Sequence, residues 1–262
     1  MTSLTIGLDA DAPARFRHAL ATLPRSFGVV EASHAAVVIV GGAPGWTDRA
    51  RRHLEDGTGS VLVGDPVPED ARALRVSATD AGALIMLASA GAHDPALDAI
   101  RERVRASDGG LLECRVITSP SDSHGATTVA MLGLIRRVDS AVVEVDAISS
   151  DAYGFHAIGR LESGRDVLLA ADVCEAVGSA ARLRVVSSTG LVEADIPFTE
   201  RSRPARVRTV SDSGEWHAEQ VFVSPARRVL ERLHSTITGQ ETLGDLDAFL
   251  EDLSRSRRLV WT

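Results

Sequence analysis

Apolar and polar residues alternate in blocks along the first 110 residues. Three short runs are almost purely apolar: 35–42, 60–64 and 83–89. Apolar runs of this length are typical of parallel strands that are covered on both faces. Amphipathic stretches over 47–57 and 94–110 follow the first and the last of these runs, and each ends at glycine. The pattern predicts a doubly wound α/β domain over residues 1–110.

The pattern changes after residue 110. A helix is expected over 125–138, and most of the chain from there to about residue 223 alternates between apolar and polar positions. Hairpin-like turns fall at Ser163-Gly164 and at Thr189-Gly190, and two amphipathic helices close the chain. Alternation with a period of two is typical of strands that have one face buried. We therefore predict a second domain over 111–262, of the α+β class, with a large and mostly antiparallel open sheet.

Charge and hydropathy narrow the choice of partners. The 262-residue chain has a formal net charge of −8, which does not favour binding to nucleic acid or to an anionic membrane. No apolar run reaches the roughly 18–20 residues that span a bilayer. The N-terminus lacks the basic and apolar regions of a secretory signal. We predict a cytoplasmic protein with no nucleic-acid and no membrane partner.

The two cysteines indicate neither a metal site nor a disulfide framework. Cys114 and Cys174 lie far apart, and neither belongs to a Cys-x-x-Cys or Cys/His spacing. Two structural thiols in a reducing compartment fit this usage best. We expect no bound metal.

Two stretches carry a resemblance to a known family. The segments "VVIVGGAPGWTDRARRHLEDG…VLVGDP" (37–66) and "RLRVVSSTGLVEADIPF" (182–198) are similar to parts of the Gfo/Idh/MocA family, the glucose–fructose oxidoreductases and inositol dehydrogenases. The resemblance implies an N-terminal Rossmann domain for NAD(P), here shortened, and a C-terminal open sheet through which subunits pair. It also implies a sugar or polyol as substrate.

The dinucleotide positions of the family are altered here. A Rossmann fingerprint places three glycines between the first strand and its helix, where the diphosphate binds. The turn here is "GLDADAP", in which only Gly7 fits the fingerprint. We expect Asp11 to cap the following helix, and Asp9 and Asp11 to face the place of a diphosphate. Glu31 could stand for the acidic residue that binds ribose, but too few residues follow it to form the usual next helix.

The catalytic positions also depart from the family. The family has Glu-Lys-Pro where this chain has Gly64-Asp65-Pro66, and all 28 basic residues are arginine, so no lysine replaces the missing one. Arginine does not deprotonate near neutral pH and is therefore no substitute for a catalytic lysine. The family's histidine and aspartate on the helix that enters the second domain correspond here to His124 with Thr127, or in another alignment to His124, Thr128 and Met131.

These departures favour a degenerate member that has lost NAD(P) binding and binds no cofactor. Such a protein would act as a binder of a sugar-like or polyol-like ligand, or as an accessory subunit of an active relative. One alternative is an NAD(P)-dependent sugar or polyol oxidoreductase with an atypical cofactor site. Another is a non-redox enzyme that uses the former sugar pocket, with His124 or His156 as its base.

We expect any small ligand to lie between the two domains. The candidate ligand-binding residues are Gly41, Gly42, Trp46, Asp65, His124 and His156. His124, His156 and Asp65 are also the candidates for catalysis, if any catalysis exists. We further expect a dimer or other oligomer, formed with a second copy or with a full-length relative, in which the second-domain sheet mediates the contact.

Overall fold

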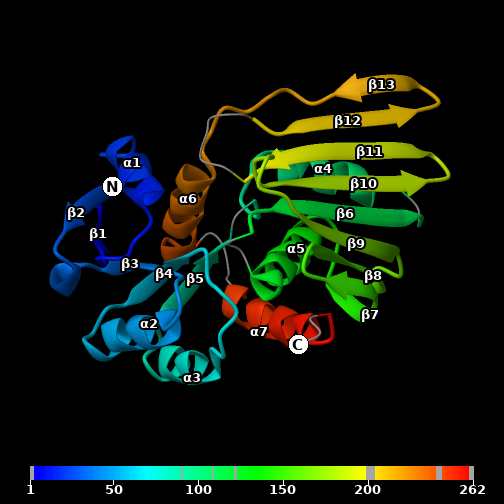
Figure 1. Ribbon diagram of the computed structural model, residues 1–262. Coiled ribbons are helices and arrows are strands. Elements are labelled where there is room, and N and C mark those ends of the chain that lie inside the picture. The colour runs from blue at the N-terminus through cyan, green and yellow to red at the C-terminus, as the bar shows by residue number, and fades with distance from the viewer. Residues whose placement is uncertain are drawn as a thin grey trace. The chain divides into compact units, whose positions relative to one another are not determined.

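The computed structural model describes residues 3–89, 91–107, 109–120, 123–198, 204–239 and 244–259. The chain forms two compact units, each built on its own sheet (Figure 1). The first unit comprises Met1–Ser89 with Ser224–Glu251, and the second comprises Ala90–Val223 with Asp252–Thr262.

The first unit contains a parallel sheet in the order β2-β1-β3-β4-β5. Its strands are β1 (Leu4–Leu8), β2 (Phe27–Val30), β3 (Val37–Gly41), β4 (Ser60–Gly64) and β5 (Leu84–Ala88). Its helices are α1 (Ala14–Ala21), α2 (Trp46–Glu55), α3 (Arg72–Asp80) and α6 (Pro225–Ile237). Every residue of β3 and β4 is buried, as the continuous apolar runs predict. The expected Rossmann-like α/β architecture is confirmed.

The connection from β2 to β3 is short. A single 3₁₀ turn, η1 (Ala32–His34), crosses from one side of β1 to the other, in place of a helix. This turn packs directly on β1, because a Cβ atom at Gly7 would lie 2.5 Å from the Cα atom of Ala32. Gly7 is thus required by the shortened connection. The turn η1 fills the space beside Gly7, so no ligand can approach the backbone there.

Helix α6 completes the core of the first unit. Its buried residues Ala226, Val229, Leu230 and Leu233 form one apolar cluster with β1, β3 and α1. Ser224 caps the helix by accepting a hydrogen bond from the Arg227 amide at 3.2 Å. The sequence places all of 111–262 in one domain, whereas α6 and the first part of α7 (Asp245–Ser256) group with the first unit.

The second unit contains an eight-stranded sheet in the order β13-β12-β11-β10-β6-β9-β8-β7. Its strands are β6 (Leu111–Thr118), β7 (Val142–Asp151), β8 (Gly154–Leu161), β9 (Asp166–Val173), β10 (Ala180–Ser187), β11 (Gly190–Pro197), β12 (Arg206–Ser211) and β13 (Gly214–His217). Only β6 and β9 pair in parallel, so the expected mostly antiparallel sheet is confirmed. Helices α4 (Ala96–Arg105) and α5 (His124–Val138) share its main apolar core.

A buried arginine joins three parts of the second unit. Arg165 and Asp139 form an ion pair at 2.8 Å, and their side chains are only 6% and 7% exposed. Arg165 also donates to the carbonyl oxygens of Gly109, Val104 and Ser107. The pair therefore ties the turn between β8 and β9 to the ends of α4 and α5.

The described residues contain no group of three or more metal-ligating side chains. Cys114 is fully buried in the second core, and burial raises the pKa of its thiol to about 12. This placement fits the structural role expected for it. No helix within the described ranges is both long and apolar enough to cross a bilayer.

Candidate functional site

The strand order of the first unit reverses at β1. The chain places β2 on one side of β1 and then crosses over to place β3 on the other side. In open α/β sheets, ligands bind outside the carboxyl ends of the strands at such a point. Two loops meet there: residues 9–13 after β1, and residues 42–45 after β3. The chemistry of this edge depends on what these loops present.

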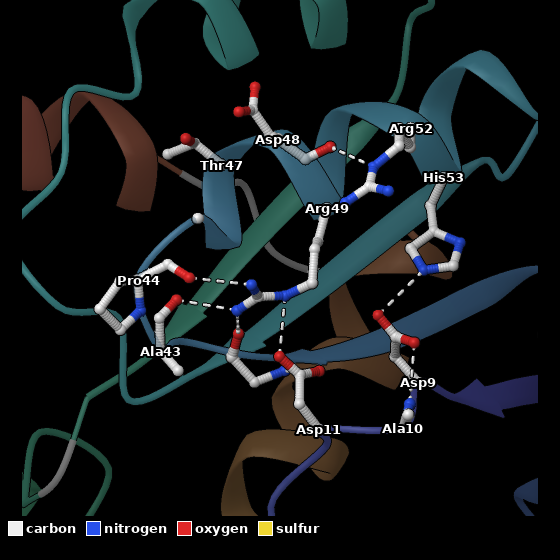
Figure 2. Close-up of polar contacts among 12 residues, drawn as sticks. Asp9, Ala10, Asp11, Ala43, Pro44, Thr47, Asp48, Arg49, Arg52 and His53 are labelled. Carbon is white, nitrogen blue, oxygen red and sulfur yellow. Dashed lines mark hydrogen bonds and ion pairs between the residues drawn. The ribbon is translucent and has the colours of Figure 1, made fainter.

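Asp11 spans the gap between the two loops (Figure 2). Its Oδ1 atom accepts a hydrogen bond from the Gly41 amide at 3.0 Å, and its Oδ2 atom lies 2.8 Å from Nε of Arg49. The predicted cap is wrong, because α1 begins after Pro13 with no side-chain cap. The carboxylate binds donors from the neighbouring strand and helix instead of the first turn of its own helix.

Arg49 is held mainly by backbone atoms. Its two terminal nitrogens donate to the carbonyl oxygens of Gly41 at 3.1 Å, Ala43 at 2.8 Å and Pro44 at 2.9 Å. Its Nε atom is buried and, despite the close approach of Asp11, has no aligned hydrogen-bond partner among the described residues. Asp11 therefore balances the charge of Arg49 without satisfying this donor.

Asp9 lies beside the same loops. Its Oδ2 atom is 3.4 Å from Nε2 of His53, and its Oδ1 atom accepts from the Ala10 amide at 2.8 Å (Figure 2). The edge thus carries two aspartates from one loop and two basic or titratable side chains from α2.

The N-terminus of α2 is also occupied by a carboxylate. Glu69 accepts hydrogen bonds from the Gly45 amide at 2.6 Å and from the amide and hydroxyl of Thr47. Burial raises the pKa of Glu69, but these hydrogen bonds and the charge of Arg49 together outweigh burial, so the pKa lies below its ordinary value of 4.5. Glu69 thereby supplies the anion that a helix N-terminus favours.

The predicted Gly41-Gly42 pair lies at closely packed backbone. A Cβ atom at Gly41 would be 2.3 Å from the backbone oxygen of Asp11, and one at Gly42 would be 2.2 Å from that of Asp65. Both glycines are required by neighbouring loops of the chain itself. The structure brings Gly41, Gly42 and Asp65 together, but the chain fills the space that the glycines leave.

Asp65 is the only described non-glycine residue with positive φ, at 53°. Its Oδ2 atom forms an ion pair with Arg15 of α1, while its buried Oδ1 atom has no hydrogen-bond partner among the described residues. A left-handed aspartate is uncommon and costs conformational energy. At the position where the resemblance expects a lysine, the chain thus carries an anion that is paired with an arginine.

Trp46 is a core residue in this structure. Its side chain is fully buried, its indole nitrogen donates to the Val67 carbonyl at 2.9 Å, and its ring meets Phe249 edge to face. Burial of this kind accounts for the tryptophan without a ligand.

The two predicted histidines lie on opposite faces of β8. His124 begins α5 and packs edge to face against Phe155, a residue of the main core. His156 is the next residue after Phe155 and points to the exposed face, where Nδ1 lies 3.2 Å from the Ser149 hydroxyl. Because successive side chains of a strand alternate, the structure does not bring these two imidazoles together.

The positions next to His124 provide no acid. Thr128 donates to the His124 carbonyl at 2.7 Å, Thr127 faces Thr118 at 3.5 Å, and Met131 is buried in the core. None of these side chains can act as the aspartate of the family's catalytic pair.

The exposed face of the eight-stranded sheet carries arginines paired with acids. Arg184 lies between Glu113 and Glu193, Arg208 contacts Glu193 and Glu215, and Arg182 pairs with Asp195. These contacts run across β6, β10, β11, β12 and β13. Pairs of this kind between neighbouring strands stabilise a sheet modestly and leave a nearly neutral surface.

Comparisons with known proteins were made for the whole chain. No protein-family model and no curated protein matches the sequence. Among solved structures, a candidate NADPH-dependent oxidoreductase of Desulfitobacterium hafniense DCB-2 has a TM-score of 0.80 at 10% identity, over 99% of this chain and 95% of that chain. UDP-N-acetylglucosamine 3-dehydrogenase GnnA of Acidithiobacillus ferrooxidans has a TM-score of 0.76 at 14% identity, over 99% and 98%.

The 3-ketoreductase KijD10 of Actinomadura kijaniata, solved in complex with NADP, has a TM-score of 0.69 at 12% identity, over 98% of this chain and 97% of that chain. These neighbours are oxidoreductases of the Gfo/Idh/MocA type, so the fold that the resemblance implies is confirmed. Identities this low establish shared architecture and not shared chemistry. The chain has the fold of NAD(P)-dependent dehydrogenases.

Proposed function

We propose that this chain is a non-catalytic protein with a dehydrogenase fold that does not use NAD or NADP. The observation that carries the proposal is the carboxylate of Asp11, which takes both the Gly41 amide and the charge of Arg49 at the edge where such sheets bind ligands. The chain thereby places its own anion against the donors that an enzyme would offer to its ligand.

Charge supports the proposal. A diphosphate at the start of α1 would face both Asp9 and Asp11. At about 5 Å and an effective dielectric constant of about 20, each contact between like unit charges costs about 3 kcal/mol before relaxation. The Arg49 and His53 side chains are already engaged with these aspartates. A micromolar dinucleotide site would be weakened beyond the millimolar range.

The positions that would bind the adenosine ribose and the diphosphate are also altered. Glu31 immediately precedes η1, and its exposed carboxylate lies 3.9 Å from Nδ1 of His34. The Gly7 position, which would approach the diphosphate in a Rossmann fingerprint, is packed against Ala32. Both features follow from the shortened connection between β2 and β3.

The absence of lysine supports loss of catalysis. Asp65 stands where the family carries its lysine, and the sequence contains no lysine at any position. With an aspartate paired to Arg15 in place of that lysine, the family's hydroxyl oxidation lacks the lysine that it uses at this position. The roles consistent with such a site are binding of a sugar-like or polyol-like ligand and assembly with an active relative.

A second candidate is an NAD(P)-dependent oxidoreductase with an atypical site, which the likeness to NADP-bound KijD10 favours. Calorimetric titration of the wild type with NAD(H) and NADP(H) decides between the two, with KijD10 and NADP as the positive control. The proposal expects no binding tighter than about 1 mM. A dissociation constant below about 100 μM would reject the proposal in favour of the oxidoreductase.

The assembly role has its own test. If the eight-stranded sheet mediates pairing, static light scattering should give twice the 27.7 kDa mass at micromolar concentration. A charge reversal at an exposed pair, Asp195→Arg, should shift the mass towards that of the monomer, since the same face of both copies would then carry an excess of positive charge. A monomeric wild type would remove self-association and leave a different chain as the partner.

A further inference from the structure

We propose that the Gly41 amide and the Arg49 guanidinium form a binding site for the carboxylate of a ligand, and that Asp11 occupies this site until the ligand displaces it. This pair of donors is called the carboxylate cradle below. The inference assigns a ligand class to the site on which the proposed function rests.

The cradle has the geometry of a carboxylate site. One oxygen of Asp11 lies 3.0 Å from the Gly41 amide and the other lies 2.8 Å from Nε of Arg49. Two donors on two different elements thus converge on the two oxygens of one planar anion. A carboxylate from solution could reproduce both contacts.

The cradle does not depend on Asp11 for its shape. Three backbone carbonyl oxygens, of Gly41, Ala43 and Pro44, hold the guanidinium of Arg49 through its terminal nitrogens. Figure 2 shows the contacts with Ala43 and Pro44. Carbonyl groups position the charge without neutralising it. The guanidinium therefore keeps its place and its positive charge when the aspartate withdraws.

Asp11 fits the cradle incompletely. The buried Nε atom of Arg49 lies close to the carboxylate, yet it has no aligned hydrogen-bond partner among the described residues. A tethered side chain cannot turn freely to align with both donors. A free carboxylate can do so and would add an aligned hydrogen bond to the ion pair that this donor already makes with Asp11.

Exposure and charge indicate how the exchange occurs and which anion is favoured. The side chains of Asp11 and Arg49 are 33% and 22% exposed, so water reaches the ion pair. Separating the two charges therefore costs little free energy. Asp9 and Glu69 add two further negative charges nearby, and Glu69 interacts with Arg49 electrostatically. These neighbours disfavour a dianion such as phosphate and favour a monocarboxylate.

The test uses acetate as the probe and inorganic phosphate as the competing anion. Calorimetry measures affinity, and the amide resonance of Gly41 reports the position of binding. Asp11→Ala opens the cradle. Asp48→Ala is the matched control, because Asp48 lies in α2 next to Arg49 and its side chain is 72% exposed. We expect acetate to bind Asp11→Ala at least about tenfold more tightly than it binds the wild type or Asp48→Ala, since the tethered competitor is gone.

Two further variants fix the interpretation. Asp11→Asn retains the side-chain volume while removing its charge, and it should also bind acetate more tightly than the wild type does. Asp11→Ala combined with Arg49→Gln should lose the gain. Equal acetate affinity in Asp11→Ala and the wild type, an unshifted Gly41 resonance, or tighter binding of phosphate than of acetate would each overturn the inference. Dinucleotide binding by the wild type would instead reject the proposed function, so the two failures are distinguishable.

Discussion

Two arginine clusters of this molecule have the same composition and lie at different depths. Arg165 in the second unit and Arg49 in the first each donate to three backbone carbonyl groups and pair with one aspartate. The aspartate partner of Arg165 is 7% exposed, whereas Asp11, the partner of Arg49, is 33% exposed. The buried cluster joins secondary-structure elements, while the exposed cluster lies at the edge of a sheet where ligands bind. The same contacts thus serve stability in one place and can serve recognition in the other.

Breaking the buried cluster should have the largest effect. Arg165→Met leaves Asp139 buried without its partner, and we expect unfolding to become easier by about 3–5 kcal/mol. Urea unfolding followed by circular dichroism measures the change. Arg160→Met is the matched control, because Arg160 and Asp166 form a pair that is more than half exposed. A loss below about 1 kcal/mol would show that the second cluster is not a structural centre.

Next to the exposed cluster, the backbone of Gly42 packs closely against that of Asp65, and an added methyl group should disrupt this packing. Gly42→Ala places a Cβ atom 2.2 Å from the backbone oxygen of Asp65, and we expect a loss of about 1–3 kcal/mol. Gly59→Ala is the control, since its Cβ atom would be 3.7 Å from the nearest atom. If the two variants were equally stable, the loops at this edge would be more yielding than the structure indicates.

The ion pair of the exposed cluster should contribute little to stability. Asp11→Ala removes a partly exposed partner and opens the Gly41 amide to water, so we expect a change below about 1 kcal/mol. The comparison with Arg165→Met, measured by the same urea titration, separates a structural pair from a pair at a binding edge. A loss as large as that of Arg165→Met would place Asp11 among the structural residues.

Glu69 gives the smallest effect and a pH dependence of known sign. Its folded-state pKa lies below its ordinary value of 4.5, so its contribution is present above that pH and is lost as the pH falls through the folded-state value. Wild type and Glu69→Gln should therefore differ in unfolding free energy at pH 7 and converge in acid. A difference that does not change with pH would contradict the assignment of Glu69 as the anion at the start of α2.

The sequence predicts most of the architecture and only part of the site. Continuous apolar runs identify β3, β4 and β5, and the few residues between Glu31 and β3 exclude a helix there. The partner of Asp11 could not be predicted in this way, since the choice between the α1 terminus and the Gly41 amide depends on how two loops meet. For the same reason Arg49 and Glu69 were missed: an arginine and a glutamate near a helix start are ordinary surface residues in a sequence.

The placement of helix α6 shows a similar limit. Its apolar positions predict a buried face, but the pattern does not say which sheet that face covers. Contact with α1 and β5 assigns it to the first unit. The same holds at β8: His124 and His156 are expected in one site, whereas the alternation after Phe155 places His156 on the face opposite the core side on which His124 lies.

The most direct test of the central claim reads the edge of the first sheet itself. Wild-type protein labelled with nitrogen-15 at glycine is titrated with NADP and with NADPH, and the amide resonances of Gly41 and Gly42 are followed. Because Asp11 occupies the Gly41 amide and the chain packs closely around Gly42, we predict that neither resonance moves at dinucleotide concentrations up to about 1 mM. A saturable shift of these resonances, with a dissociation constant below about 100 μM, would contradict the claim that the chain's own carboxylate has replaced the cofactor.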